Sequence, residues 1–205
     1  MVARCLDSLV APGVQLIIVD NGSTADVKRA IKGRDAIVIR NKVNHYVNPA
    51  WNQVMAVFLS QPGYDLLVLA NSDLVLDPGW AQKLGEHRQT CQSDLIFGID
   101  AGRQRPSLGS FFALSRRAVE AVYPIPDDLL VFGGDDFIFA VARGIGCKEH
   151  VLESLTMSHV ERGTYDKSPE IWDVGRRDTV RWRRHVLPKL VPKRIAKILA
   201  NKHKR

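Results

Sequence analysis

The chain has 205 residues, of which 45% are apolar, and a formal net charge of +7. This length suits one domain with or without an appendage, and the apolar content is ordinary for a globular protein. No run approaches the ~18 to 20 apolar residues of a membrane span, and no signal-peptide core opens the chain, so we expect a cytoplasmic protein. Cys5, Cys91 and Cys147 are widely spaced without a CxxC pair, which predicts reduced thiols.

The first half of the chain alternates predicted helices and strands. In order, we expect a helix over residues 4–10, a strand over 14–19, a helix over 25–32, a strand over 36–39, a helix over 50–59 and a strand over 66–70. Strands that alternate with helices of about ten residues predict a mostly parallel sheet flanked by helices.

The last of these strands leads into three polar residues. Its five consecutive apolar residues suit a strand that is buried on both faces, and Asn71, Ser72 and Asp73 follow directly. Ligands of open α/β sheets bind at the carboxyl ends of the strands. Because these residue types also favour turns, the triplet is either part of a ligand site or a simple turn.

The second half of the chain has a different organisation. We expect a helix over residues 79–90, strands over 95–99 and 109–114, helices over 116–122 and 137–143, and a strand over 150–155 that is followed by His159. Gly133 and Gly134 precede the acids Asp135 and Asp136 at the start of one helix. The acids suit a helix amino terminus, and the two glycines permit close approach of the backbone to a ligand.

Basic residues are concentrated at the end of the chain. Residues 176–205 contain twelve Lys and Arg and one acid, a net +11, so the other 175 residues carry −4. Apolar residues recur among these charges at helical spacing. Such a basic helix packs on the body, lies on an anionic membrane or binds nucleic acid, and all three options stay open. We divide the chain into a domain over residues 1–165 and a basic helical extension over 166–205.

Three blocks in this order resemble a nucleotide-sugar glycosyltransferase of the GT-A fold, closest to family 2. They read IVDNGST at residues 18–24, LANSD at residues 69–73 and FGGDD at residues 132–136. They are similar to the VDNGSTD block, the DxD-type motif and the WGGED or ED motif. The loop over residues 44–52 is similar to the Asn- and Gly-rich segment of the family.

This resemblance implies an α/β, Rossmann-like GT-A fold with a mostly parallel central sheet. It also implies an enzyme that moves a sugar from a nucleoside diphosphate sugar to an acceptor hydroxyl. Family members normally begin with a strand that carries part of the nucleotide site, and residues 1–5 cannot supply it. We therefore expect this first strand to be missing, so that it is either encoded upstream or the site is built without it.

The diphosphate leaving group requires neutralisation of its developing charge. Mn²⁺ or Mg²⁺ supplies this when it is held by oxygen ligands, often with an imidazole. Asp73 and His159 are the expected metal ligands, although Asn71 replaces the first acid of a full DxD motif. A lone histidine in a loop is the alternative interpretation of His159.

Attack by the acceptor hydroxyl requires a general base. By resemblance, Asp136 is this catalytic base and Asp135 is the companion acid that binds the acceptor or the sugar. One in-line displacement with such a base predicts inversion at the anomeric carbon. The structural alternative is that both acids only cap a helix.

The donor site takes residues from several blocks. By resemblance, the donor-binding residues are Asp20, Asn21, Asn44, Asn52, Asn71, Ser72, Asp73 and Arg162. Asp20 contacts the nucleotide base in this interpretation, and it equally suits a turn or a helix cap. Asn44 and Asn52 line the pocket or satisfy loop backbone, and Arg162 lies on the diphosphate or in solvent.

The expected acceptor is a glycan, a protein or a modified nucleic acid. The expected surface partners are an anionic membrane or DNA, reached through the basic extension, which would make the protein peripheral to the membrane. Two other functions stay open. The first is a degenerate protein that binds sugar nucleotides, and the second is a nucleic-acid-binding protein or a transferase that acts on modified DNA bases.

Overall fold

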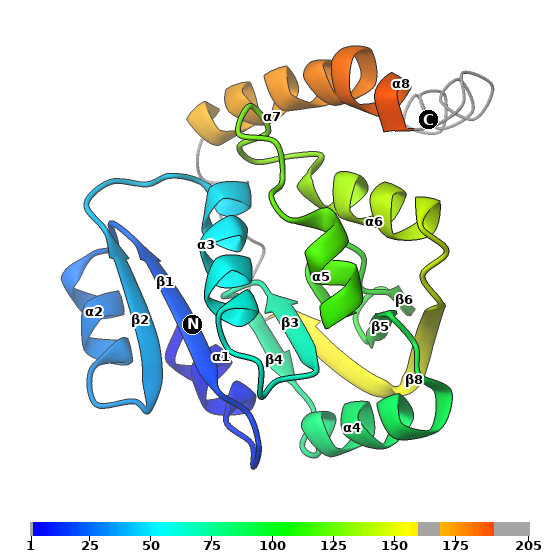
Figure 1. The fold of residues 1–205 in the computed structure, drawn as a ribbon. Coiled ribbons are helices and arrows are strands. Elements are labelled where there is room, and N and C mark those ends of the chain that lie inside the picture. Colours follow the sequence, from blue (N-terminus) through cyan, green and yellow to red (C-terminus); the bar gives the residue numbers. More distant parts are fainter. Residues whose placement is uncertain (1, 160–168, 191–205) are drawn as a thin grey trace.

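The computed structural model describes residues 2–159 and 169–190 (Figure 1). The first half contains α1 (Val2–Leu9), β1 (Leu16–Asn21), α2 (Ala25–Ile31), β2 (Ala36–Asn41), α3 (Val47–Leu59), β3 (Leu66–Ala70) and β4 (Leu74–Leu76). The predicted helices and strands of this half are therefore confirmed. Helix α3 begins three residues earlier than the apolar spacing predicts.

The second half contains the remaining elements. These are α4 (Trp80–Cys91), β5 (Leu95–Asp100), β6 (Arg105–Pro106), β7 (Phe111–Ser115), α5 (Arg116–Val122), α6 (Gly134–Gly144), β8 (Glu149–His159), α7 (Pro169–Arg181), a π-helical turn (Trp182–Val186) and α8 (Leu187–Leu190). Helix α5 begins directly after β7 because the Ser115 hydroxyl accepts a hydrogen bond from the Ala118 amide, at 3.2 Å. Within the described residues, no helix is long and apolar enough to cross a membrane.

The strands form two sheets. Strands β1 and β2 pair in parallel, and a six-stranded sheet has the order β3-β7-β5-β8-β4 with β6 beside β5. In this larger sheet β5 and β8 are parallel, whereas β3 with β7, β5 with β7 and β4 with β8 are antiparallel. The α/β class is confirmed, and the sheet is mixed rather than mostly parallel. Strands β5, β6 and β7 follow one another through short loops without a helical crossover, and parallel pairing requires such a crossover.

The larger sheet is covered on both faces. One apolar cluster joins Phe112 of β7 to side chains of α3, α5 and α6, including Trp51 and Phe139. A second cluster joins Phe111 of the same strand to Trp80 of α4. Successive side chains of a strand point to opposite faces, so the continuous apolar sequence of β7 is buried on both sides. Each buried phenylalanine contributes about 1.5 to 3 kcal/mol of hydrophobic stabilisation.

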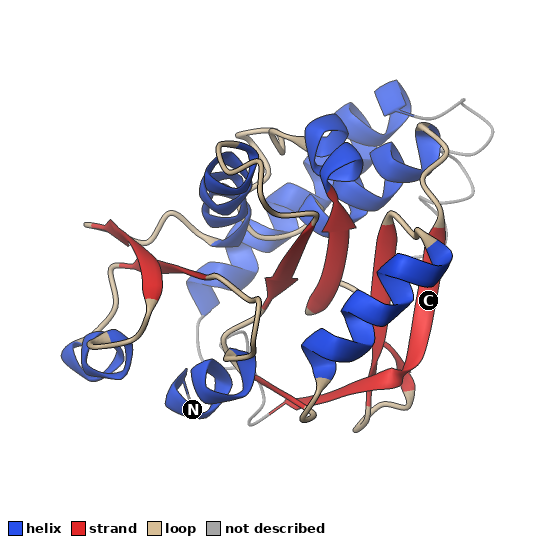
Figure 2. Cartoon of the chain, turned by 60° about the horizontal axis from the view of Figure 1, so that its bottom comes forward, coloured by secondary structure: helices blue, strands red, loops and turns tan. Residues whose placement is uncertain are grey.

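The two sheets are separated between β1 and β3. Strand β1 pairs with β2 and β3 pairs with β7, and among the described residues no strand lies between β1 and β3 (Figure 2). Residues 2–9, which precede β1, form helix α1 rather than a strand. A cavity of about 630 Å³ lies between β1 and β3 and is lined by both strands.

Candidate functional site

The cavity between β1 and β3 brings together most of the predicted donor-binding residues. Its lining includes Asp20, Asn21, Asn44, Asn71, Ser72 and Asp73, together with apolar side chains of β1, β3 and α3. Its volume is within the range of ordinary small-molecule sites. Asp20 and Asn21 end β1, and Asn71, Ser72 and Asp73 follow β3, so two strand ends supply polar groups to one largely apolar cavity.

Asp20 is buried at the end of β1. Its Oδ1 accepts a hydrogen bond from the Ser23 amide at 2.9 Å, and its Oδ2 pairs with the Arg40 guanidinium at 3.0 Å. Burial raises the pKa of Asp20, but the hydrogen bonds from Ser23 and the charge of Arg40 outweigh this effect and hold the pKa below its ordinary value. Asp20 therefore carries a negative charge at neutral pH and also shapes the turn after β1.

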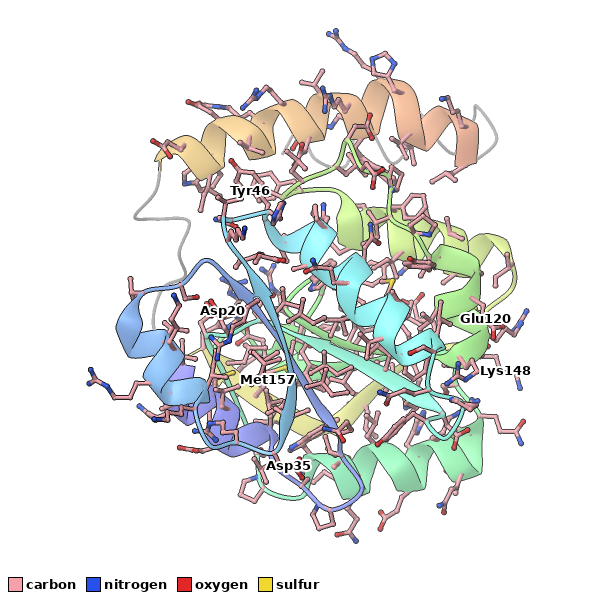
Figure 3. The ribbon with its side chains drawn as sticks, turned by 60° about the vertical axis from the view of Figure 1, so that its left-hand side comes forward. Asp20, Asp35, Tyr46, Glu120, Lys148 and Met157 are labelled. Atoms are coloured by element: carbon pink, nitrogen blue, oxygen red, sulfur yellow. The ribbon has the colours of Figure 1, made fainter. Side chains whose placement is uncertain are left out.

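A chain of side-chain amides lies beside Asp20. Asn21 donates to the Tyr46 carbonyl at 2.9 Å and accepts from Asn41 at 2.7 Å, and Asn41 also bonds with Gln53 of α3. Figure 3 labels Asp20 near the end of β1 and Tyr46 in the loop that leads into α3. These bonds fix the loop against the strand end.

The two asparagines predicted from the loop before α3 have different positions. Asn44 is exposed, lines the cavity and accepts a hydrogen bond from the Tyr46 amide at 2.8 Å. Asn52 does not line the cavity, because its amide makes two hydrogen bonds with the backbone of Ile125, at 2.8 and 2.9 Å. Asn52 therefore satisfies backbone groups, which is one of the two roles that the sequence allowed for it.

The triplet after β3 is anchored by its backbone. The Asn71 amide donates to the Ser110 carbonyl at 2.9 Å, and the Asn71 carbonyl accepts from the Cys5 thiol at 3.5 Å. Burial, with a contribution from the charge of Asp73, raises the pKa of Cys5 to about 11. The Asp73 carboxylate makes no hydrogen bond or ion pair with the described residues and lines the cavity. Its oxygens are thus available to a cation.

His159 ends β8 and lies close to the same triplet. Leu74, which follows Asp73, pairs with His159 in the antiparallel β4–β8 ladder. His159 Nδ1 lies 3.3 Å from Asp100 Oδ2, and Asp100 is buried at the end of β5. A carboxylate on one ring nitrogen orients an imidazole and leaves the other nitrogen for a metal. The sequence analysis did not identify Asp100, although its position at a strand end matches that of Asp20.

The predicted metal ligands fit a divalent cation only as a partial set. Within the described ranges, no group of three or more His, Cys, Asp or Glu side chains is arranged to hold a metal ion. Asp73 offers a hard carboxylate and His159 an imidazole, which are donor types suited to Mn²⁺. Any cation here therefore needs further ligands, and the diphosphate of a donor is a chemically suitable source.

Asp135 and Asp136 lie in the first turn of α6 and do not line the cavity. A methyl group added at Gly109 would lie 2.4 Å from Asp135 Oδ2, so this carboxylate packs closely on the turn before β7. The hydrogen bond from Arg143 to Glu149 raises the pKa of Arg143 against the effect of burial, and the charges of Glu149 and Asp136 add to the rise.

Two predictions fall on undescribed residues. Arg162 lies outside the described residues, and so does the part of the basic extension over residues 191–205. The described part of the extension includes α7, and Ile171 of this helix lines the cavity together with Val131 from the loop before α6. The sequence analysis missed Asn48 and Asp178, which contact the loop before α6, because each acts on backbone atoms far away in the sequence.

A family model described as "Glycosyl transferase family 2" matches residues 1–106, slightly more than half of the chain. The chain belongs to glycosyl transferase family 2. Its class of activity is accordingly that of a glycosyltransferase. A comparison with curated proteins found no significant match.

Solved structures of glycosyltransferases share the fold of this family 2 chain. Glucosyl-3-phosphoglycerate synthase from Mycobacterium tuberculosis, solved with Mn²⁺, UDP and phosphoglyceric acid, has a TM-score of 0.62 at 18% identity. The match covers 84% of this chain and 70% of the synthase. TarS from S. aureus, residues 1–349, has a TM-score of 0.62 at 16% identity, with 87% of this chain and 60% of TarS covered.

A third structure, GalNAc-T7 with UDP, GalNAc and Mn²⁺, has a TM-score of 0.54 at 13% identity. The match covers 73% of this chain and 38% of GalNAc-T7. These likenesses confirm the GT-A fold that the three sequence blocks predicted.

Proposed function

We propose that this family 2 glycosyltransferase moves a sugar from a nucleoside diphosphate to an acceptor hydroxyl in one inverting, metal-assisted displacement. The observation that carries the proposal is the cavity between β1 and β3, because Asp20 and the Asn71–Asp73 triplet reach it from two different strands. The structures of glucosyl-3-phosphoglycerate synthase and GalNAc-T7 contain UDP and Mn²⁺, which is consistent with such a donor.

The donor is held by the polar lining of the cavity. Asp20 accepts hydrogen bonds from the nucleotide base through lone pairs that Ser23 and Arg40 leave open. Asn21, Asn44, Asn71 and Ser72 donate to the ribose or the diphosphate. The apolar side chains of β1 and β3 exclude water from the base. Arg162 remains a predicted contact of the diphosphate.

Asp73 and His159 would hold a divalent cation. When bound, the cation neutralises the negative charge that develops on the diphosphate leaving group. Asp100 holds the His159 ring with Nδ1 toward its own carboxylate, so Nε2 carries the lone pair that faces away from Asp100.

Asp136 accepts the proton of the acceptor hydroxyl as its oxygen attacks the anomeric carbon. Asp135, packed on Gly109, orients the acceptor or the transferred sugar. Attack from one face while the diphosphate leaves from the other inverts the anomeric configuration. The loops over residues 101–107 and 123–130 are exposed candidates for acceptor recognition, and contacts of the basic extension with membranes or DNA stay predictions.

Calorimetric titration with UDP, GDP, ADP, CDP and dTDP, each with and without Mn²⁺, tests the donor site. We expect one nucleotide to bind and Mn²⁺ to strengthen its binding, and Asp73→Ala to abolish the effect of Mn²⁺. The control is Asp35→Asn, since Asp35 is exposed and precedes β2 at the opposite end from Asp20 (Figure 3). Failure of every nucleotide to bind would refute the proposal.

One competing function is supported by a specific observation. Asn71 replaces an acid of the resembling motif, and in the described part of the chain no strand pairs with β1 and β3 on the sides that line the donor cavity. The replaced acid and the absent strand both suit a protein that binds a sugar nucleotide without transferring the sugar. Incubation with the matching nucleoside diphosphate sugar and proton NMR of the anomeric signal separates the two functions. Transfer or hydrolysis with inversion supports the enzyme, and an unchanged donor supports the binding protein.

A further inference from the structure

The loop over residues 129–133 leads directly into α6 and its two acids, and it is held from two sides. On one side is Asn48 of α3, and on the other side is α7, which crosses this end of the molecule (Figure 1). The loop ends at Gly133, which has φ 77° and precedes Asp135 and Asp136. The conformation of this loop therefore determines the positions of both acids in the first turn of α6.

Asp178 of α7 supplies the contact from the second side. Its carboxylate is buried, and Oδ2 accepts hydrogen bonds from three successive amides, those of Leu130 at 3.0 Å, Val131 at 2.5 Å and Phe132 at 3.1 Å. A negative oxygen shared by three backbone donors makes strong, charge-assisted hydrogen bonds. Asp178 is also the single acid within the basic residues 176–205.

The packing around these hydrogen bonds requires close approach of α7. A methyl group added at Gly175 would lie 2.3 Å from the ring of Phe132, and one added at Gly133 would lie 3.2 Å from Trp182. The ring of Phe132 also meets Trp172 edge to face, with centroids 5.9 Å apart. The absence of a side chain at Gly175 of α7 and at Gly133 of the loop therefore allows the helix to pack closely on the loop, in addition to the hydrogen bonds of Asp178.

Asn48 of α3 holds the loop from the other side. Its amide nitrogen donates to the Leu129 carbonyl at 3.2 Å, and its backbone amide donates to the Leu130 carbonyl at 3.1 Å. A methyl group at Gly134 would lie 2.1 Å from Asn48 Oδ1. The loop is consequently fixed at its carbonyls by α3 and at its amides by α7.

We propose that Asp178 is a positioning residue for the transfer reaction. By holding the amides of residues 130–132, it sets the Gly133–Gly134 turn and thereby the placement of Asp135 and Asp136 relative to the donor cavity. This inference rests on the proposed function. It gives α7 a role in positioning the proposed catalytic base, Asp136, in addition to carrying positive charge. Asp178 touches backbone and no reacting atom in this scheme.

The test compares Asp178→Asn with Asp173→Asn in the full chain. Both changes remove one acid from α7, but Asp173 is exposed and pairs with Arg176 on the surface. We expect Asp178→Asn to lower kcat at least tenfold while the donor KM and nucleotide affinity stay within twofold of the parental values. Amide hydrogen exchange at residues 130–132 should accelerate in the same variant. Asp173→Asn should change neither property.

A second variant covers the case in which Asp178→Asn does not fold. Gly175→Ala keeps the carboxylate and raises helix propensity, but its methyl group displaces the ring of Phe132. It should show the same fall in kcat with an unchanged donor KM. A parental kcat in a folded Asp178→Asn or Gly175→Ala variant would overturn the inference about Asp178 and leave the proposed function standing. Absence of transfer by the parental chain overturns the proposed function, and the inference with it.

Discussion

Replacement of Asp100 by Asn tests the assignment of His159 as a metal ligand. Asp100 Oδ1 accepts hydrogen bonds from the amides of Gly102 at 3.1 Å and Arg103 at 3.3 Å, and only an oxygen serves both donors. In Asp100→Asn the amide oxygen therefore stays at this position, and the amide nitrogen faces His159 Nδ1. An NH₂ group donates where the carboxylate accepted, so the ring proton moves to Nε2.

The magnitude follows from these contacts. Protonated Nε2 cannot ligate a metal, and loss of a carboxylate behind a ligating histidine typically lowers metal affinity 10- to 100-fold, about 1.4 to 2.7 kcal/mol. Stability should fall by less than about 1 kcal/mol, since Oδ1 keeps its two amides and the Arg103 guanidinium that pairs with Oδ2 is largely exposed to solvent.

Titration of Mn²⁺ into the chain with its nucleotide measures the affinity, and ¹⁵N NMR of the imidazole reports the tautomer. Asp35→Asn is the matched control, because it changes an exposed acid that does not line the cavity. Parental Mn²⁺ affinity in an Asp100→Asn variant whose ring proton has moved to Nε2 would show that His159 is not a ligand.

Two further predictions concern ionisation. Asp94 is buried just before β5; burial raises its pKa, but hydrogen bonds from the Ser115 hydroxyl and the Lys148 amide and the charge of Arg117 outweigh this effect. The pKa values of Asp20 and Asp94 therefore lie below the ordinary 3.8, so the stability they contribute is full above that pH and is lost as pH falls through the lower folded values. Urea midpoints should therefore drop as the pH falls below about 4, and combined Asp20→Asn and Asp94→Asn replacement should flatten this drop; an equally steep curve would contradict the assignment. Cys5, buried with a pKa of about 11, should resist iodoacetamide at pH 8 under conditions that alkylate exposed Cys91, and equal labelling of both in the folded chain would refute this.

Local sequence signals predicted most elements of the fold. Pro12 and Gly13 mark the end of the first helix, and apolar runs that stop at polar residues mark β1 and β3. These signals act within a few residues, so they can be read without knowing the tertiary contacts. The mixed direction of the larger sheet depends on which strands pair, and the pairing of β4 with β8 joins segments about 80 residues apart.

The same distinction applies to the candidate site. Strand ends identified Asp20 and Asp73, and the structure places both on one cavity. Asp100 beside His159 and Asp178 beneath residues 130–132 were not predicted, because each depends on a contact between distant segments. For Asn52 the sequence left two roles open, lining the pocket or satisfying backbone, because its hydrogen bonds with Ile125 also join segments that are far apart in the sequence.

Asp136→Asn tests the central claim most directly, with donor binding and transfer measured on the same preparation. The variant keeps the size of the side chain and the start of α6 but removes the proton acceptor. We predict nucleotide affinity within twofold of the parental value and a transfer rate lowered by about 10²- to 10⁴-fold. Sugar transfer at the parental rate would contradict the account.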